Sequence, residues 1–503
     1  MTVAATAVWR VRPSGSNTNG GGYDTGISSA ATGSNGSLSG VTFTDATAAA
    51  FTSGMVGASI NIVGVGQYLI ASRISASQIT LGVGSGGALP QLSGNYAWTV
   101  GAGQDYSQQN AAQATGTHGH AVGTTTFTDL TALAFTAAMV GNAIYITGDS
   151  LTTGWYFVTG YTSSSVITLD RTPGTSGASA GTWSLGGGWA DPITNTGFVN
   201  SIPVPGNYVY VLGSGTPNPA SYTFDYTVAN NVGTVQGNST SGKIVFACDP
   251  MTPNYLPPPD TSGGMPCIGI TSGQRLFLNG AYNLYSGLWM VMVGQAASVA
   301  IIVPTGGNLA IVGCVFDQAG YDGKAIDDEH GILFLGSEIF SSVGGSGSGV
   351  AVYTYGTSFY AFNNIHDVVA NGIQEDGGRL QLSGNIIAKC GGYGFKSTYA
   401  STLNVVGNTI DGNAGNGVDI DQATLSQSTF CNNILSNHTT AGKYAFSVQA
   451  GTASVNDALA LCFDFNTYYN NTTNLNVIGY GPHDTQLSTD PYVGQSTENY
   501  ALA

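Results

Sequence analysis

The second half of the chain alternates apolar and polar residues in short stretches that recur at a nearly constant interval. SGVAVYTYG, NGIQEDGG, YGFKSTYA and NGVDIDQA align on glycines at steps of 23, 22 and 23 residues. These glycines are Gly349, Gly372, Gly394 and Gly417. A second series stays in phase with them at steps of 26, 22, 23 and 25 residues, and comprises Ser337, Asn363, Asn385, Asn408 and Asn433. Two features in phase over several turns of about 23 residues indicate a solenoid.

The pattern predicts a right-handed parallel β-helix, in which each short strand pairs with its equivalent one turn away, at about 4.8 Å. Apolar residues of successive turns are expected to stack inside, and they are Ile373, Phe395, Val418, Ile365, Ile387 and Ile410. Asparagines at the bends are expected to bond neighbouring backbone groups, and the glycines to take corners with positive φ. A helical solenoid is disfavoured because the apolar positions alternate and glycine recurs in every unit.

The N-terminal part contains a different repeat, a duplicated module of short alternating strands. FTDATAAAFTSGMVGASINIVG begins at Phe43 and FTDLTALAFTAAMVGNAIYITG begins at Phe127, an offset of 84 residues. The corresponding residues are Asp45/Asp129, Phe51/Phe135, Met55/Met139, Gly57/Gly141, Ile62/Ile146 and, slightly out of register, Trp98/Trp183. SINIVG, AIYITG, GWYFVTG and SVITLD alternate as half-buried strands do.

Together the two repeats predict an all-β chain. We expect an N-terminal arm with the first strands over 1–40, one module over 41–104, a polar linker over 105–124 and the second module over 125–190. A right-handed parallel β-helix with a C-terminal cap is expected over 198–503.

Composition narrows the classes of function. Only 8% of the 503 residues are charged and 74 are glycine, which suits a β protein rich in tight turns. A net charge of −16 disfavours a nucleic-acid partner, because phosphate binding needs clustered Lys and Arg. The start MTVAATAVWRVRPSG is a poor signal peptide, since Arg10 interrupts its apolar run. No stretch reaches the roughly 18 apolar residues of a membrane helix, so we expect a soluble chain folded in a cytoplasm.

Two parts of the chain resemble known protein families, and these resemblances imply a fold and a class of function. The Gly/Asn turns resemble the pectate-lyase-like right-handed β-helix superfamily, from about Ser201 to the C-terminus. IPVPGNYVYVLGSG is similar to a first turn of such domains, and FDFNTYYNN with TDPYVGQSTENYALA is similar to the last turns. VWRVRPSGSNTNGGGYD and DYSQQNAAQ, with the duplicated module, resemble structural proteins of tailed bacteriophages. This second resemblance implies a virion protein.

A patch on the outer face of the β-helix is the best candidate site. Residues i and i+2 of a strand share a face, so Asp419 and Asp421 point outward if Val418 and Ile420 point inward. Asp411 is expected on the same solvent face. Equivalent positions one turn apart are Lys396 and Thr398, then Gln374 and Asp376, then Ala351 and Tyr353. The candidate glycan-binding patch is therefore Tyr353, Asp376, Lys396, Asp419 and Asp421.

Catalysis at this patch would use Asp419, Asp421 or Asp376. The α-carbons of Asp419 and Asp421 are expected roughly 6.6 Å apart by strand rise, comparable with the carboxylate spacing of inverting glycosidases. Against catalysis, an ion pair of Lys396 with Asp419 explains both residues. The NTD, GHG and RIK signatures of polygalacturonase-type enzymes are absent from the sequence. Calcium-assisted lyases need an arginine base beside clustered acids, and Arg379 is the only arginine nearby.

Other polar groups favour structural roles. AIDDEHGI, with Asp327, Asp328, Glu329 and His330, has the composition of a solvated loop. His118 and His120 have i, i+2 spacing but two histidines alone rarely hold a metal, so a polar linker is favoured. His366 and Asp367 are expected to form a bend. The aromatic residues Tyr353, Tyr355, Phe359 and Tyr360 suit sugar stacking or, equally, plain β-propensity. No CxxC or zinc spacing occurs, and buried free thiols are expected at Cys248, Cys267, Cys314, Cys390, Cys431 and Cys462.

The sequence favours a non-enzymatic structural protein on the outside of a phage particle, a capsid decoration or an appendage. The N-terminal modules would dock to other virion proteins and the β-helix would project, as a homotrimer, towards a host-surface glycan. No cofactor, metal or membrane insertion is expected. The alternative is a tailspike depolymerase, a glycoside hydrolase or lyase acting on bacterial surface polysaccharide. A secreted adhesin would need an export signal that the sequence does not show.

Overall fold

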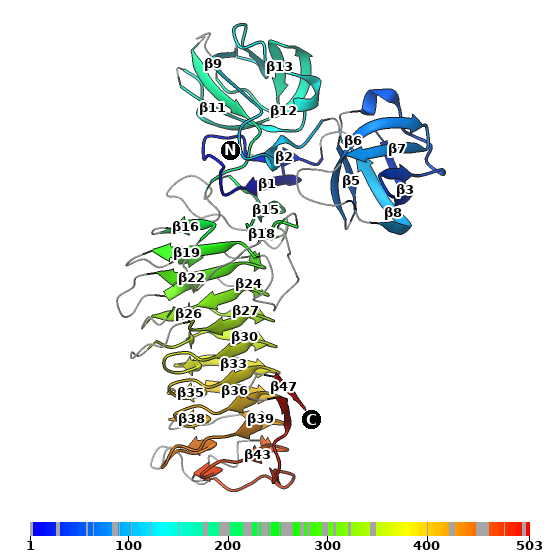
Figure 1. Ribbon diagram of the computed structural model, residues 1–503. Helices are drawn as coiled ribbons and strands as arrows, with labels where there is room; N and C mark the ends of the chain where they lie inside the picture. Colours follow the sequence, from blue (N-terminus) through cyan, green and yellow to red (C-terminus); the bar gives the residue numbers. More distant parts are fainter. Residues whose placement is uncertain are drawn as a thin grey trace. The chain divides into compact units, whose positions relative to one another are not determined.

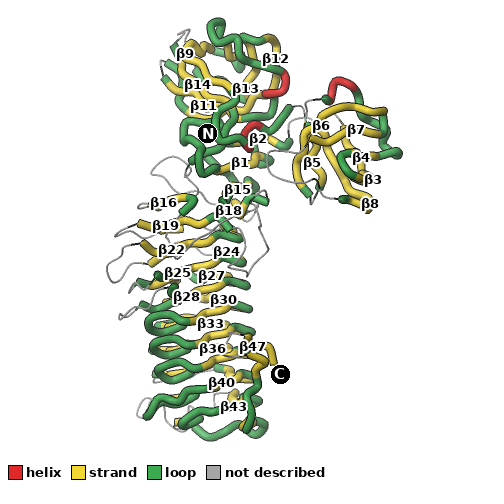
Figure 2. Tube along the Cα trace, in the orientation of Figure 1, coloured by secondary structure: helices red, strands yellow, loops and turns green. Residues whose placement is uncertain are grey.

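A computed structural model describes residues 4–502 apart from gaps, the larger of which are 83–88, 175–179, 191–201, 215–223, 233–239, 253–264, 294–299, 343–348, 422–427 and 449–461. The predicted start of the β-helix at residue 198 lies outside the described residues. The chain divides into two compact units, one made of 1–193, 197–215 and 244–255, the other of 194–196, 216–243 and 256–503. The described residues form strands with three short 3-10 turns and no α-helix, which confirms the predicted all-β class (Figures 1 and 2). None of these turns is long or apolar enough to cross a membrane.

The duplicated modules are two closed six-stranded antiparallel barrels with the same topology. The neighbour orders are β3-β4-β7-β6-β5-β8 and, in the second barrel, β10-β13-β12-β11-β14-β9. The first barrel contains β3 (Ala31–Ser39), β4 (Thr42–Thr44), η1 (Ser53–Met55), β5 (Ser59–Ile62), β6 (Gly66–Ser75), β7 (Gln78–Gly82) and β8 (Leu92–Val100). The second contains β9 (Ala114–Ala121), β10 (Thr126–Thr128), η3 (Ala137–Met139), β11 (Ala143–Thr147), β12 (Gly154–Ser163), β13 (Val166–Leu169) and β14 (Gly181–Leu185).

The predicted linker over 105–124 is wrong in part, because residues Ala114–Ala121 form a strand of the second barrel. ATGTHGHA forms β9, which pairs with β10 and β14 and closes the barrel. The stretch looked like a loop because it is polar and contains two glycines. Gly116 and Gly119 are required there, since a Cβ at either position would lie 2.3 Å from Trp183 or 2.5 Å from Phe127. The two glycines that close packing requires interrupt the alternation of apolar and polar residues by which a strand is recognised in the sequence.

The residues matched between the copies build the same core in each barrel. Phe51 stacks on Trp98 with ring centroids 4.7 Å apart, and Phe135 packs on Trp183 at 4.8 Å. Each tryptophan also donates a hydrogen bond of 2.8 Å from its indole nitrogen to a buried aspartate, Asp45 or Asp129. The same aspartates accept backbone N–H groups at the start of the following turn. The duplication therefore preserves a buried Asp–Trp pair.

Asp129→Asn is expected to lower the free energy of unfolding of the second barrel by about 2 kcal/mol at neutral pH, because hydrogen bonds to a charged acceptor are lost. Burial by itself raises the pKa of Asp129, but the hydrogen bonds from Ala132 N, Trp183, Thr131 N and His118 N outweigh burial and lower it. A lowered folded-state pKa gives stability that is full above the unfolded value of about 3.9 and lost as pH falls through the folded value.

The difference between wild type and Asp129→Asn should accordingly shrink below about pH 4. Calorimetric unfolding of both proteins at neutral pH and at pH 3 measures this. Glu329→Gln, at an exposed position, is the control that should change neither midpoint. Equal stability of wild type and Asp129→Asn at neutral pH would rule out a stabilising role for the charge.

The N-terminal unit also contains four hydrogen-bonded strands in the order β2-β1-β15-β18. These strands are β1 (Ala7–Val11), β2 (Gly22–Asp24), β15 (Tyr208–Val211) and β18 (Ile244–Cys248), accompanied by the turn η2 (Tyr106–Gln108). A buried ion network fixes these segments together. Arg10 bonds Asp105 at 3.2 Å and Asp249 at 3.1 Å, and Arg12 bonds Asp249 at 2.8 Å. The two arginines of VWRVR are therefore structural.

The second unit is a solenoid of three parallel sheets, as predicted (Figure 1). The first sheet contains β21 (Asn283–Ser286), β24 (Leu309–Val312), β27 (Ile332–Leu335), β30 (Thr357–Ala361), β33 (Gly378–Ser383), β36 (Ser401–Val406), β39 (Thr429–Cys431) and β42 (Cys462–Asp464). The second contains β16 (Tyr226–Val228), β19 (Cys267–Thr271), β22 (Trp289–Val293), β25 (Val315–Asp317), β28 (Glu338–Phe340), β31 (Asn364–His366), β34 (Ile386–Ala388), β37 (Thr409–Asp411), β40 (Ile434–Ser436), β43 (Thr467–Tyr469) and β45 (Thr485–Leu487). The third contains β17 (Asn231–Val232), β20 (Leu276–Leu278), β23 (Ala300–Pro304), β26 (Lys324–Asp328), β29 (Val352–Thr354), β32 (Ile373–Glu375), β35 (Phe395–Ser397), β38 (Val418–Ile420), β41 (Phe446–Val448) and β44 (Leu475–Asn476).

The asparagine series forms a buried ladder at the bend before the second sheet. Each side-chain oxygen accepts hydrogen bonds from the backbone nitrogen and the side-chain amide of the preceding member, at 2.9–3.1 Å between Asn363, Asn385 and Asn408. The ladder continues through Asn433 to Asn466, whose backbone and side-chain nitrogens both bond Asp484. Each rung is thus tied to the next by side chains as well as by strands.

The glycine series has a different role from the one expected. Gly372, Gly394 and Gly417 do not have positive φ angles; a Cβ at any of them would lie 2.5–2.7 Å from a backbone oxygen of the next rung. They are needed for close stacking. Positive φ angles occur instead at the residue before each ladder member. These residues are Gly336, Phe362, Gly384, Gly407, Asn432 and Phe465, with φ between 52° and 69°. Gly313, one turn before Gly336, has φ of 58°.

Of the two stretches expected to form the last turns of the solenoid, FDFNTYYNN does so in β42 and β43, whereas TDPYVGQSTENYALA does not. β46 (Tyr492–Gly494) and β47 (Asn499–Leu502) are antiparallel and pack on the outer face of the second sheet, around Ala388. The Tyr492 and Tyr500 hydroxyls contact Ser436 at 2.8 Å and Asp411 at 3.3 Å. Asp411 is therefore buried under this hairpin, contrary to its predicted exposure. The hairpin supplies cover that no local pattern around Asp411 indicates.

Candidate functional site

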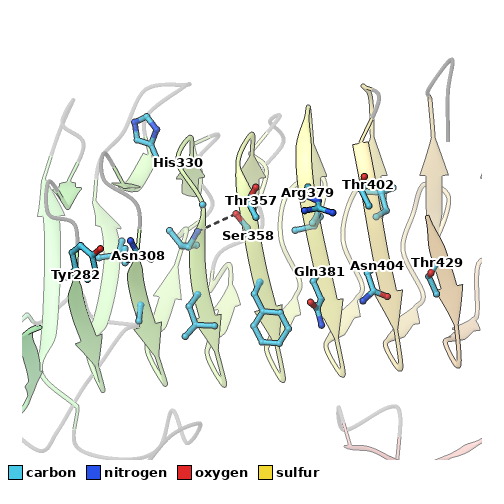
Figure 3. Close-up of a pocket in the computed structure, with 18 of the residues that line it drawn as sticks. Tyr282, Asn308, His330, Thr357, Ser358, Arg379, Gln381, Thr402, Asn404 and Thr429 are labelled. Atoms are coloured by element: carbon cyan, nitrogen blue, oxygen red, sulfur yellow. Dashed lines mark hydrogen bonds between the residues drawn. The ribbon is translucent and has the colours of Figure 1, made fainter. Parts of the chain in front are cut away.

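A groove of about 1040 Å³ runs along the outer face of the first sheet, across successive rungs (Figure 3). Its walls come from β24, β27, β30, β33, β36 and β39. The lining residues are Lys243, Tyr282, Asn308, Leu309, Ala310, His330, Gly331, Ile332, Leu333, Thr357, Ser358, Phe359, Arg379, Leu380, Gln381, Thr402, Leu403, Asn404 and Thr429. An extended polymer fits such a groove better than a compact ligand does.

Strand pairing arranges the exposed side chains of the groove in two rows. Thr357, Arg379 and Thr402 face one another across successive strands and form the first row (Figure 3). The second row consists of Leu333, Phe359, Gln381, Asn404 and Thr429. Successive members lie about one strand spacing, 4.8 Å, apart. The rows therefore present hydroxyl and amide groups beside apolar faces at a regular interval, which suits repeated sugar rings.

The charge of the groove is opposite to that of the chain. Its basic side chains are Arg379, Lys243 and His330, and none of the 27 Asp and Glu residues is among the lining residues that the structure describes. Arg379 is exposed, and its guanidinium has no hydrogen-bond or ion-pair partner among the described residues. Arg379 and Lys243 thus place two positive charges along the groove of a protein whose net charge is −16.

A buried aspartate, Asp328, is hydrogen-bonded to two residues that line the groove, Gly331 and Ser358. Asp328 accepts hydrogen bonds from Gly331 N at 2.8 Å and from the Tyr360 hydroxyl at 2.8 Å, and from the Ser358 hydroxyl. Burial, followed by the negative charge of Asp328, raises the pKa of Tyr360 well above its ordinary value. The network fixes the turn that carries His330 and the floor residue Ser358. AIDDEHGI is thus not a solvated loop: Asp327 and Asp328 are buried in β26, and only Glu329 and His330 are exposed.

The patch predicted from the sequence lies along the third sheet, but the predicted alignment of Tyr353 with its neighbouring strand is wrong. Tyr353 pairs with Gln374, which pairs with Lys396, which pairs with Asp419. Tyr353 is therefore two residues out of the predicted alignment with Asp376. The error arose because the turn between β29 and β32 is two residues shorter than the glycine spacing indicates. The lining of the groove includes none of the predicted patch residues.

The carboxylates of the patch are largely engaged with neighbouring side chains. Asp376 accepts hydrogen bonds from the Tyr353 and Thr398 hydroxyls and from Gln374 at 3.4 Å. Burial first, then the hydrogen bond to Asp376, raises the pKa of Tyr353 above its ordinary value. The Tyr353 ring also lies 3.5 Å from the Lys324 ammonium, which pairs with Asp327 at 2.9 Å.

Asp419 differs from its prediction in two respects. Its side chain is only 1% exposed, and Oδ1 accepts a hydrogen bond of 2.6 Å from Asn416. Oδ2 is buried with no partner among the described residues, so the expected ion pair with Lys396 is not formed. Lys396 instead lies 5.3 Å from the Tyr393 ring. Asp421 is half-buried. Asp376, Asp419 and Asp421 remain candidates for catalysis, and none of them lines the groove of the first sheet.

The remaining predicted residues fall elsewhere. His118 is exposed on β9, where it lies beside Thr117. His366 lies between two carboxylates, with Nδ1 2.8 Å from Asp367 and Nε2 3.0 Å from Glu338, and Asp367 has the positive φ of a bend. Among the aromatic candidates, Phe359 lines the groove and Tyr355 is exposed, whereas Tyr360 is fully buried and unavailable to a ligand.

Sequence reasoning missed most of the groove. It identified Arg379 only as an isolated arginine, and it did not identify Gln381, Asn404 and Thr429. These residues are about 22–25 positions apart in a chain where polar residues on outward positions are ordinary. A signal was present in the phase of the repeat, because Thr357, Arg379 and Thr402 occupy the same place in successive turns.

This arrangement defines a right-handed parallel β-helix with a long external groove. Residues 299–459 match the family described as right handed beta helix region. No curated protein matches the chain.

Among solved structures, the chain is similar to the A-module of the Azotobacter vinelandii mannuronan C-5 epimerase AlgE4, with 13% identity, TM-score 0.27 and coverage of 57% of this chain and 84% of that one. It is also similar to a GH87 α-1,3-glucanase catalytic domain in complex with nigerose, with 11% identity, TM-score 0.31 and coverage of 76% and 89%. A third, the GH87 α-1,3-glucanase of Streptomyces thermodiastaticus strain HF3-3, has 11% identity, TM-score 0.27 and coverage of 75% and 86%. Similarities at this level assign no reaction to this chain.

Proposed function

We propose that the β-helix binds an extended polysaccharide that carries acidic groups, along the groove of the first sheet. The observation that carries this proposal is the pairing of a long row of hydroxyl and amide side chains with Arg379, in a groove whose described lining contains no carboxylate. Guanidinium groups bind carboxylates and phosphates through two parallel hydrogen bonds, which fixes both charge and orientation. Phe359 and Leu333 supply apolar faces for sugar rings.

Binding is preferred to cleavage because glycoside hydrolysis needs two carboxyl groups beside the scissile bond. Of the candidate carboxylates, Asp419 lies in β38 of the third sheet, and Asp376 and Asp421 directly follow β32 and β38; Asp376 and Asp419 are buried. The depolymerase alternative would place the substrate on that sheet. The two hypotheses therefore predict different faces for the ligand, and a substitution on each face separates them.

Arg379→Gln is expected to weaken binding of an acidic polysaccharide by roughly tenfold to hundredfold, since a charge-assisted hydrogen bond contributes about 1.5–3 kcal/mol. Titration calorimetry with alginate, polygalacturonate and polysialic acid measures the effect, and neutral dextran should bind less tightly. The wild-type affinity should fall as salt rises, because the field of the groove is screened.

Lys396→Gln is the matched control, because it removes one positive charge from the third sheet. It should leave the affinity unchanged. A loss with Lys396→Gln and not with Arg379→Gln would move the ligand to the third sheet and overturn the proposal. Release of reducing ends from these polymers, abolished by Asp419→Asn or Asp376→Asn, would establish the depolymerase instead.

For the N-terminal unit we propose docking to other proteins of a phage particle, on the strength of the resemblance of VWRVRPSGSNTNGGGYD and of the duplicated barrels. Two rigid closed barrels without free strand edges suit permanent attachment better than regulated contact. The whole chain would then be a homotrimeric virion protein on the particle surface. Electron microscopy of purified particles with a labelled antibody tests the location. Sedimentation of a stable monomer at micromolar concentration would exclude the trimer.

A further inference from the structure

Two cysteine thiols contact each other at the end of the groove sheet. The sulfur atoms of Cys431 on β39 and Cys462 on β42 are 3.7 Å apart. The two strands are parallel neighbours, with Thr429 opposite Cys462 and Cys431 opposite Asp464. Cys462 therefore continues the row of the groove that ends in Thr429. The two residues are 31 positions apart in the sequence, and only the fold brings them together.

The other four cysteines are free thiols too, but they differ from this pair in burial. Cys248, Cys267, Cys314 and Cys390 are buried, whereas Cys431 is half-buried and Cys462 is exposed. Burial raises the pKa of Cys267 and Cys314 to about 12. Thiols of that kind are inert because the thiolate is the reactive form. Accessibility and contact thus single out one pair of the six.

A metal site does not account for this pair. Asp464 and His483 lie next to it in the fold, but Asp464 is already bonded to His483 Nδ1 at 2.7 Å and to the backbone nitrogens of Phe465 and His483. No group of three metal-ligating side chains occurs among the described residues. Two thiols without a third ligand are suited to oxidation, in which each supplies one sulfur.

We propose that Cys431 and Cys462 are a disulfide modification site, oxidised by a small-molecule disulfide such as oxidised glutathione. Because Cys462 pairs with Thr429 and Cys431 with Asp464, the bond requires a shift of the start of β42 along β39 towards Cys431. The exposed Cys462 thiolate attacks the disulfide, forms a mixed disulfide and releases one glutathione thiolate. The Cys431 thiolate then attacks the Cys462 sulfur and releases the second. Two protein thiols lose two protons and two electrons, and one glutathione disulfide becomes two thiols.

The order of attack follows from the two environments. Burial, then the hydrogen bond to Cys462, raises the pKa of Cys431, so the exposed thiol reacts first. The bond would join β39 to β42 and close the chain that runs from Cys431 through β40 and β41 to Cys462. Closing a loop of this length restricts the unfolded chain, and the last rungs of the groove sheet become harder to separate.

The position of Lys443 permits a direct test on the full chain without any substitution. No Lys or Arg follows Lys443, so trypsin places Cys431 in the peptide Ser397–Lys443 and Cys462 in Tyr444–Ala503. The native protein is incubated with oxidised glutathione, alkylated, digested without reductant and analysed by mass spectrometry. The expected result is an intact mass lower by two hydrogens, loss of both accessible alkylation sites and a disulfide-linked pair of these two peptides.

Controls separate the bond from general thiol oxidation. The protein treated with a reductant should regain two alkylation sites and yield the two peptides separately. Cys431→Ser should instead retain glutathione on Cys462, because the resolving thiol is missing. Two outcomes would overturn the proposal: alkylation of both Cys431 and Cys462 after oxidation, or a persistent glutathione adduct at Cys462 beside a free Cys431 in the wild type.

Discussion

Asn408→Ala is expected to destabilise the β-helix by about 3–5 kcal/mol, the cost of leaving several buried polar groups without partners. The Asn408 side-chain oxygen accepts the Asn385 backbone nitrogen and side-chain amide, both at 2.9 Å. Its amide donates to Asn433 Oδ1 and to the Leu382 carbonyl, both at 3.1 Å. Alanine removes all four bonds at a position where water does not reach, since Asn408 is 1% exposed.

Hydrogen exchange followed by mass spectrometry measures this effect rung by rung, which suits a protein of two units that does not unfold in one step. Amides of β34, β37 and β40 should lose protection, while those of the two barrels should not. Asn404→Ala is the control, because Asn404 lies nearby on the outer face and lines the groove. It should change stability by less than about 0.5 kcal/mol. Equal effects of the two substitutions would show that the ladder is not a main source of stability.

Gly394→Ala is the second large effect, expected to cost about 3 kcal/mol by overpacking. A Cβ at this position would lie 2.7 Å from each of three atoms: Asn413 Nδ2, the Gly417 backbone oxygen and Ile410 Cγ2. The backbone oxygen belongs to the next rung, so it gives way only if the spacing between the two strands increases. Strand spacing is set by hydrogen bonds along all three sheets, and one methyl group therefore disturbs a whole turn.

Gly412→Ala is the matched comparison for the glycine effect. Gly412 has φ of 57°, and no atom lies within 4 Å of the place that an added methyl group would occupy. Alanine there incurs only the backbone penalty of about 1–2 kcal/mol. Exchange protection of β35 and β38 should fall further in Gly394→Ala than protection of β37 falls in Gly412→Ala. The reverse order would mean that backbone conformation, and not the closeness of the rungs, explains the recurring glycines.

The sequence predicted the solenoid well because its period is a local property. Each asparagine precedes a short apolar strand, and the repeat near 23 residues exposes both the strands and the bends. The direction of the asparagine bonds was less evident. We expected them to satisfy neighbouring backbone, whereas Asn385 and Asn408 also bond each other across rungs. We expected the recurring glycines to adopt positive φ angles, whereas Gly394 is needed because a side chain there would clash with residues of the next turn. That contact, too, joins residues distant in the sequence.

Burial of the acidic residues was harder to predict than strand direction. Alternation correctly placed Asp419 opposite the core residues Val418 and Ile420 in its strand. It did not reveal that Asn416 bonds Asp419 or that the C-terminal hairpin covers Asp411. An outward direction was equated with exposure, and outward side chains of a solenoid are exposed only where no loop or hairpin lies over them.

By itself, the sequence determined the all-β class, the duplication of a small β module and the parallel β-helix, because repeated patterns of burial need no knowledge of distant contacts. That each module closes into a barrel around a buried Asp–Trp pair came from the structure. Tertiary structure decided that the outer face of the first sheet forms a groove. It also placed Arg379 between Thr357 and Thr402, and brought Cys431 to Cys462. These contacts join residues that are one rung apart in space but more than twenty positions apart in the chain. No pattern among neighbouring residues in the sequence indicates them, because outward-facing positions accept many kinds of side chain.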